Sequence, residues 1–420
     1  MATETPTLVE LAEQILAQAK EIESALPSSP TFVNDTISKL PSDLEKTRKS
    51  LIDTTETLNA LLRGAGGPVG RIFDKCYTYP DELALHVIYH FRIPQAVPMD
   101  GQISFAELAA KVKVDETQLI RILRHGMSIH LFHEPTRGQV AHTADTALLV
   151  TDHTLFDLVG TLLEDLRPAG LAFPTAMEKW PGSQEADQTG WQVAYDTSMS
   201  MYDHICQYPE RISRFSNHLT QIARFDPRAS EHFASAYPWG DLPPGSTIVD
   251  IGGGNGQYSV AVAERYSHLN FIVQEKPGVS VEGAATLPAH LKDRIKFMDH
   301  DMFDSQPVKD ADIYFMRHVF HNWSDKYCVE VLKKLIPALK PGAKVLACDL
   351  CIPDVGERAE VERREVTRID LMMMSLYNAR ERDVEQVKDL FEAADDRLDF
   401  QKGYTLEGCM DKICEATWKG

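Results

Sequence analysis

The feature that most constrains this chain is a regular alternation of short apolar strands and helices that begins near Ser246. The stretch STIVDIGGGNGQYSVAVAERY, residues 246–266, predicts a strand, a glycine-rich loop and a helix in that order. Consecutive parallel strands need crossover helices, so the alternation predicts an α/β fold with a parallel sheet. Further strands are predicted within residues 270–277, 295–303, 311–320 and 343–350, with a helix over 325–339.

Two helical regions precede this alternating part. Residues 6–65 form two amphipathic runs with no evident core of their own, which indicates packing against a partner subunit. Residues 80–145 predict a winged helix, because residues 105–132 have the pattern helix, turn, helix with Asp115 as an N-cap, and a wing strand follows. We therefore divide the chain into a helical dimerisation and winged-helix domain (1–150), a helical linker with substrate-pocket residues (151–236) and an α/β domain (237–420).

Charge and hydropathy exclude several partners. A winged helix can bind DNA, but the net charge of -19 would repel phosphates, and Arg121 and Arg124 of the second helix are surrounded by apolar residues. A packing module is therefore preferred, with neither nucleic acid nor a membrane surface as a partner. The sequence has no apolar run of about 18 residues that would span a bilayer, and its first residues do not resemble a secretory signal.

The cysteines favour a reducing, cytoplasmic compartment. Seven scattered cysteines do not form a disulfide framework. Cys348 and Cys351 form a CxxC, but it lies in a predicted buried strand and its exit. Because no second CxxC or histidine pair accompanies it at zinc spacing, no metal site is predicted.

The glycine loop and two later strand ends predict the cofactor. A lone glycine loop can hold a pyrophosphate, but Gly252-Gly253-Gly254-Asn255-Gly256 is not GxGxxG, and Asp250 beside it would repel one. The Asp250 carboxylate can instead bind the cationic group of an amino acid through a bridging water molecule. Glu275, at the end of the second strand, can accept both ribose hydroxyls, and Asp301 can accept an adenine amino group under Met302 and Phe303. These residues indicate a nucleoside that carries an amino acid.

With these motifs, the C-terminal half resembles the class I methyltransferases, which bind S-adenosylmethionine. Residues 60–418 resemble the plant and fungal caffeate-type O-methyltransferases, and VAHTADTALLV, AMEKWPGSQE and CEATW are similar to the fungal natural-product branch. The resemblance implies a Rossmann-like catalytic domain after a winged-helix dimerisation domain, and a homodimer. It also implies that the cofactor contacts Gly252, Gly254, Glu275, Asp301, Met302 and Arg317, with Glu275 in place of the family's usual Asp.

The same resemblance implies a catalytic histidine. His321 lies in HNWSD (321–325), after a strand whose carboxyl end faces the expected site. A neutral imidazole can accept a phenol proton near neutral pH. The family orients this base with two acidic residues, which Asp349, replacing the usual Glu, and Glu381 match in this chain. Ala379 replaces a glycine that the family usually has in this loop.

For the acceptor pocket, the resemblance points to Met373 and Asn378, with two further positions near His153 and Leu219. We expect an O-methyltransferase that acts on a phenol or enol of a secondary metabolite. The alternative is a pericyclase of the same family, which binds S-adenosylmethionine but catalyses dehydration or cyclisation with a histidine and a basic residue, matched by His153 and Arg317. A catalytically inactive scaffold is the third hypothesis.

Overall fold

A computed structural model describes residues 6–33, 35–63, 67–226, 228–406 and 408–420. The chain forms two compact units. The first contains the described residues up to Arg167, together with Ile205–Ile222 and Ala359–Val361. The second contains the described residues of Pro168–His204, Ala223–Arg358 and Glu362–Gly420, so the predicted middle segment, 151–236, is shared between the units.

The first unit begins with two paired helices, α1 (Leu8–Ala25) and α2 (Glu45–Leu62). The Thr7 hydroxyl accepts from the Glu10 amide at 3.2 Å and closes a capping box, which fixes where α1 starts. Leu11 and Ile22 are buried, and the Gln18 side chain of α1 donates to the Ser50 hydroxyl of α2 at 2.8 Å. The helix α2 ends at Leu62, which confirms the predicted end of the second amphipathic run.

The predicted winged helix is present in the same unit. It consists of β1 (Ile103–Ser104), α6 (Phe105–Val112), α7 (Glu116–Ser128) and the wing strand β2 (Gln139–Val140), which pairs antiparallel with β1. Asp115 caps α7 by accepting from the Gln118 amide at 3.0 Å, as expected. The other helices of the unit are α3 (Pro68–Cys76), α4 (Tyr79–His90), α5 (Ile93–Ala96), α8 (Ala144–Thr151), α9 (His153–Gly160), the π-helix η4 (Thr161–Leu166) and α13 (Pro209–Ala223).

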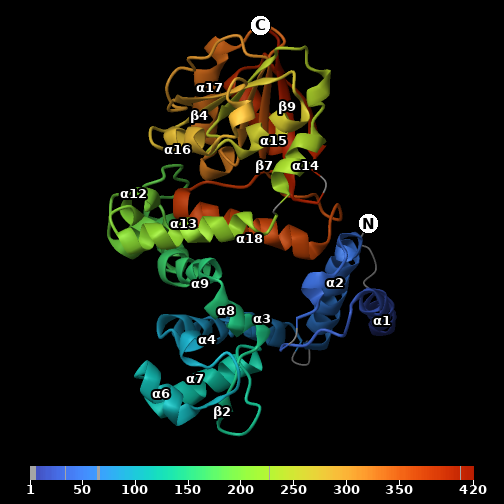
Figure 1. The fold of residues 1–420 in the computed structure, drawn as a ribbon, viewed down its shortest axis with the longest axis vertical. Coiled ribbons are helices and arrows are strands. Elements are labelled where there is room, and N and C mark those ends of the chain that lie inside the picture. Colours follow the sequence, from blue (N-terminus) through green and yellow to red (C-terminus); the bar gives the residue numbers. More distant parts are fainter. Residues whose placement is uncertain (1–5, 34, 64–66, 227, 407) are drawn as a thin grey trace. The chain divides into compact units, whose positions relative to one another are not determined.

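The second unit is built on a seven-stranded sheet in the order β5-β4-β3-β6-β7-β9-β8. Figure 1 labels β4, β7 and β9 of this sheet and several of the helices around it. The first five strands in this order run parallel, which confirms the predicted Rossmann-like α/β fold. The last two differ, because β9 pairs antiparallel with both β7 and β8. The strands are β3 (Thr247–Ile251), β4 (Asn270–Glu275), β5 (Ile295–Asp299), β6 (Ile313–Arg317), β7 (Lys344–Leu350), β8 (Leu398–Thr405) and β9 (Asp411–Trp418).

Helices cover both faces of this sheet, and the alternation of side chains along each strand separates the two cores. Val249 and Ile251 of β3 pack with α17 (Asp325–Leu335) and α19 (Val384–Ala394), whereas Ile248 packs on the other face with α14 (Ala229–Ala236) and α15 (Gln257–Arg265). The carboxyl ends of the parallel strands are thereby held rigidly. The remaining helices of this unit are α10 (Arg167–Lys179), α11 (Gly190–Tyr195), α12 (Met201–Ile205), α16 (Val279–Thr286) and α18 (Glu360–Tyr377).

Within the described residues, no single helix has the length and apolar character needed to cross a membrane. One pair of helical segments, Ala144–Thr151 and His153–Lys179, reaches this length and apolar character only when the two are counted together, and the chain bends sharply between them.

Candidate active site

The glycine loop joins β3 to α15 and turns the chain sharply. Gly252, Gly254 and Gly256 all have positive φ (71°, 57° and 76°), a conformation that residues with a Cβ rarely adopt. A Cβ on Gly253 would lie 2.4 Å from the Asp250 carboxyl carbon. The Gly252 amide donates to the Gln274 carbonyl of β4 at 2.9 Å. This hydrogen bond anchors the start of the loop to the carboxyl end of the neighbouring strand.

A cavity of about 190 Å³ opens at this end of the strands. Of the residues predicted to bind the cofactor, Gly252, Glu275, Asp301 and Met302 line it, whereas Asp250, Gly254 and Arg317 do not. Trp323 is a wall of the cavity that the sequence did not identify as such. Phe303, which the sequence predicts to cover adenine, packs edge-on against Trp323 with ring centroids 4.7 Å apart. The full lining is Ile251, Gly252, Gln274, Glu275, Lys276, His300, Asp301, Met302, His318, Val319, Asn322 and Trp323.

Asp250 lies beneath the glycine loop and is 2% exposed. Its Oδ2 accepts from the Ser259 hydroxyl at 2.6 Å. Burial raises the pKa of Asp250 to about 7, because a carboxylate is poorly solvated there, and the Ser259 hydrogen bond offsets this only in part. A cationic amino group nearby would favour the charged carboxylate, so the site is suited to an amino-acid cation.

Arg317 forms a buried network that the sequence did not reveal. Its Nη2 donates to Asp411 Oδ2 at 2.9 Å, and its guanidinium lies 4.0 Å from the centre of the Tyr258 ring. His318, which lines the cavity, contacts the other Asp411 oxygen at 3.2 Å. Burial would raise the pKa of Asp411, but His318 and Arg317 hold it well below its usual range. Asp411 lies 94 residues beyond Arg317, so no local motif links them.

These contacts fit a nucleoside cofactor that carries an amino acid. Glu275 and Asp301 supply carboxylates at the cavity, while Met302 and Trp323 supply apolar walls. In addition, the buried Nε of Arg317 has no hydrogen-bond partner among the described residues. Such an orphaned donor beside the cavity wall is consistent with a ligand that carries acceptor atoms.

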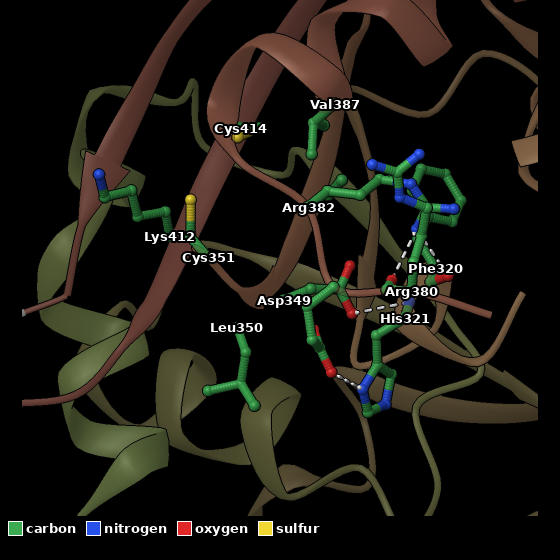
Figure 2. Close-up of a pocket in the computed structure, with 12 residues that line it drawn as sticks. Phe320, His321, Asp349, Leu350, Cys351, Arg380, Arg382, Val387, Lys412 and Cys414 are labelled. Carbon is green, nitrogen blue, oxygen red and sulfur yellow. Dashed lines mark hydrogen bonds and ion pairs between the residues drawn. The ribbon is translucent and has the colours of Figure 1, made fainter. Parts of the chain in front are cut away.

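His321 is presented by η7 (Phe320–Asn322), the short turn that follows β6. Its Nδ1 lies 3.0 Å from Oε1 of Glu381, and its side chain is 16% exposed. Figure 2 shows His321 and Asp349 next to each other in this group. Asp349 contacts the residue differently, because its Oδ1 accepts from the His321 main-chain amide at 3.4 Å. The structure therefore brings the three predicted catalytic residues together. They surround a cavity of about 10 Å³, which is the size of one water molecule.

The electrostatics of this group favour a basic imidazole. Burial lowers the pKa of His321, but the hydrogen bond to Glu381 and the charges of Asp349 and Glu381 outweigh it and raise the pKa above its usual value. With Nδ1 directed at a carboxylate, the proton of the neutral ring is expected on Nδ1. Nε2 is then the nitrogen that can accept a proton.

Ion pairs hold Glu381 opposite the histidine. The Glu381 amide donates to Asp370 at 2.9 Å. The next residue, Arg382, binds Asp325 through Nη2 at 2.7 Å and donates to the carbonyls of Phe320 and Trp323 at 3.0 and 2.9 Å. Asp325 is the last residue of the HNWSD motif, so the motif also fixes the segment that carries Glu381. The sequence identified Asp325 only as a member of this motif and did not predict its pairing with Arg382.

The predicted acceptor residues occupy different units. Met373 is buried in α18, and Asn378 follows that helix with a positive φ of 51°. The Asn378 amide nitrogen donates to the carbonyls of Glu185 and Gln188 at 2.8 and 3.0 Å, so it holds that loop. His153 and Leu219 belong to the first unit, where both are exposed on α9 and α13. The role of all four residues stays a prediction.

Comparisons with known proteins agree with this geometry. Residues 183–395 match the O-methyltransferase domain family. The O-methyltransferase AMT9 of Alternaria alternata is 35% identical over an alignment of 436 positions, gaps included, that covers 100% of this chain and 99% of that protein. The grayanic acid biosynthesis cluster O-methyltransferase of Cladonia grayi is 33% identical, over 98% of this chain and 88% of its own.

Solved structures share the fold at lower identity. OxaC in complex with sinefungin and meleagrin has a TM-score of 0.72 and 21% identity, and it covers 98% of this chain and 99% of its own. LepI in complex with SAM has a TM-score of 0.71 and 23% identity, with 97% and 99% covered. The sheet, the glycine loop and the cavity thus define a class I methyltransferase fold. The chain belongs to the O-methyltransferase family, and its cofactor is S-adenosylmethionine.

Proposed function

We propose that this enzyme methylates a phenolic or enolic hydroxyl of a fungal-type secondary metabolite, with His321 as the general base. The observation that carries the proposal is the contact of 3.0 Å between Nδ1 of the half-buried His321 and Oε1 of the buried Glu381. A base needs a fixed orientation and a free lone pair, and this contact supplies both.

The roles of the residues follow from this contact. Gly252, Glu275, Asp301 and Met302 would hold S-adenosylmethionine, which would supply an electrophilic methyl group. His321 Nε2 takes the hydroxyl proton of the acceptor, which makes its oxygen the nucleophile. Glu381 keeps the Nδ1 proton in place and stabilises the imidazolium that forms. Asp349 adds a second negative charge and holds the main chain of His321.

The relatives support the class of acceptor. Besides the grayanic acid protein, a chlorophenol O-methyltransferase of Trichoderma longibrachiatum is 32% identical over 97% of this chain. We further propose a cytoplasmic homodimer. The seven free cysteines favour a reducing compartment. Exposed apolar side chains of the first unit, among them Val69, Ile72 and Phe73, favour self-association.

The main test is incubation with S-adenosylmethionine labelled in its methyl group and a panel of fungal polyketide phenols. We expect a product that has gained one methylene in mass, with one S-adenosylhomocysteine formed per turnover. A dehydrated or isomerised product without S-adenosylhomocysteine would contradict methyl transfer. It would instead support the pericyclase alternative, in which Arg317 and His153 act on the substrate.

The first predicted variant is His321→Ala. Loss of a positioned base should lower kcat by about 10²- to 10⁴-fold. Binding of S-adenosylmethionine, measured by calorimetry, should stay near that of the unchanged enzyme, because His321 does not line the cofactor cavity. A kcat within threefold of the unchanged enzyme would show that another group removes the proton.

A further inference from the structure

Three side chains with different metal-binding atoms meet in the second unit, outside the site described above. Asp226 precedes α14, His232 lies in α14, and Cys409 lies in the turn between β8 and β9. One ligand atom from each residue lies within 4.8 Å of the other two, and all three residues are half-buried. The tertiary fold alone brings them together, since Cys409 is far from the other two in the sequence.

Two of these atoms lack the hydrogen bonds that their burial would require. Nδ1 of His232 and Oδ2 of Asp226 are buried, and neither has a hydrogen-bond partner among the described residues. They are 3.4 Å apart, yet their geometry does not form a hydrogen bond. Buried polar atoms of native proteins are almost always paired, so two facing atoms that both lack a hydrogen bond point to a ligand that they share.

The spacing of these two atoms fits a shared metal ion. Around tetrahedral zinc, bonds of about 2.0 to 2.3 Å place neighbouring ligand atoms about 3.3 to 3.8 Å apart. The observed 3.4 Å lies in this interval, although it is long for a charged hydrogen bond. Adding the sulfur of Cys409 gives a nitrogen, an oxygen and a sulfur donor, which is a set that zinc accepts.

The turn that carries Cys409 packs directly against the histidine. Gly408 has a φ of +85°, and a Cβ built on it would lie 3.1 Å from Cε1 of His232. A larger residue there would crowd the imidazole. The turn can therefore place the Cys409 sulfur beside the ring because its neighbour is glycine.

We propose that Asp226, His232 and Cys409 bind one Zn²⁺ ion per chain, with the fourth position left for water or a small ligand. The zinc spacings considered in the sequence could not reveal this site, because its ligands come from two distant segments. Cys409 lies two residues before Asp411, which holds Arg317 and His318, so the metal would also stiffen the turn that supports the cofactor side of the sheet.

A second group of possible ligands, His86, His90 and Glu164 in the first unit, is less suited to a metal. Nη1 of Arg214 donates to Glu164 at 2.9 Å. Glu164 therefore already has a cationic partner, and the guanidinium would repel a second cation at that carboxylate. The contacts of the two histidines with Glu164, at 3.7 and 3.0 Å, are explained by ion pairing.

The first test is titration of the full-length, metal-free enzyme with Co²⁺, which reports a bound thiolate by its charge-transfer absorption. We expect one equivalent to bind, and Zn²⁺ to displace it. Cys409→Ser and His232→Ala should each weaken binding at least tenfold. Cys206→Ser, which changes an exposed cysteine, should leave it unchanged. Absence of the thiolate band, or its persistence in Cys409→Ser, would overturn the proposal.

A second test needs no variant, so it does not depend on whether one folds. The enzyme is treated with iodoacetamide, with and without one equivalent of Zn²⁺, and each cysteine is followed by peptide mass spectrometry. Zn²⁺ should slow alkylation of Cys409 at least tenfold and leave the exposed Cys76 and Cys206 unaffected. An unchanged rate at Cys409 would overturn the proposal.

Discussion

At the scale of single residues, the raised pKa of His321 predicts how the proposed reaction depends on pH. The base must be neutral, so kcat should rise with pH through the pKa of His321. Glu381→Gln removes the charge and the hydrogen bond that raise this pKa, whereas burial still lowers it. We therefore expect the rising limb of the kcat profile to move to lower pH, and the plateau to fall by about tenfold or more as the ring loses its orientation.

This shift is measured from kcat between pH 5 and pH 9 with an accepted phenol. Glu385→Gln is the matched control, because Glu385 is exposed and lies four residues further on, where it pairs with Lys388. The control should keep the original profile. A Glu381→Gln profile displaced to higher pH would show that Glu381 does not stabilise the imidazolium.

The buried carboxyl of Asp250 predicts how the stability of the fold depends on pH. Unfolded Asp250 loses its proton near pH 4, whereas the folded protein keeps it to about pH 7. Between these values the folded state binds more protons, so the free energy of unfolding should fall as pH rises and level off above pH 7. The difference of about three pKa units sets an upper estimate on the order of 4 kcal/mol.

Asp250→Asn should remove this component, and the test is urea unfolding of the cofactor-free protein at pH 5 and pH 8. The loss of stability between the two pH values should be smaller in Asp250→Asn than in the unchanged protein. Asp304→Asn changes an exposed carboxyl and serves as the control. An equal loss in Asp250→Asn would show that Asp250 titrates normally in the fold.

At the scale of elements, the glycine loop is the part whose backbone must approach the cofactor. A Cβ on Gly254 would meet no atom within 4 Å, so the fold has room for a side chain there, although φ is +57°. Gly254→Val should therefore weaken S-adenosylmethionine binding at least tenfold, or about 1.4 kcal/mol, by filling space beside the cofactor. Gly342→Val is matched in backbone strain, with φ at +84° and no atom within 4 Å, and should bind normally by calorimetry.

Elements with a local signal could be predicted from the sequence, and elements without one could not. The strands β3 to β7 have apolar runs between turns, and α7 has a capping aspartate, so their type and order followed from the sequence. The antiparallel pairing of β9 with β7 depends on long-range contacts, and its direction could not be predicted. The same reason explains Asp411, whose partners Arg317 and His318 lie about 90 residues earlier.

At the scale of the whole molecule, the fold class followed from the alternation of strands and helices, and His321 and Asp349 were proposed as catalytic residues because each lies at the end of a strand. Glu381 was proposed because it matches an acidic residue of the family. The partners of Asp325 could not be predicted, since Arg380 and Arg382 lie 55 and 57 residues further along the chain and only the tertiary fold brings them to it. This pairing connects the His321 turn to the Glu381 segment. The motif therefore points to the proposed base, His321, while the tertiary contacts explain why its segment is held in position.

The exposed face of α3 predicts the assembly of the molecule. Val69, Ile72 and Phe73 are spaced three and four residues apart on one side of this helix, and they are 75%, 62% and 56% exposed in the single chain. Such a stripe is costly in water and is typical of a subunit interface. We expect a two-fold homodimer, in which a closed symmetric contact covers the stripe on both subunits.

Sedimentation equilibrium at micromolar concentration should give twice the chain mass of 47.1 kDa. The double variant Ile72→Glu, Phe73→Glu should give a single chain mass, because two buried charges would oppose each copy of the contact. Val355→Glu is the control, since Val355 is 83% exposed in the second unit and should leave the dimer intact. A monomer in the unchanged protein would refute the dimer, and a dimer in the double variant would place its interface away from α3.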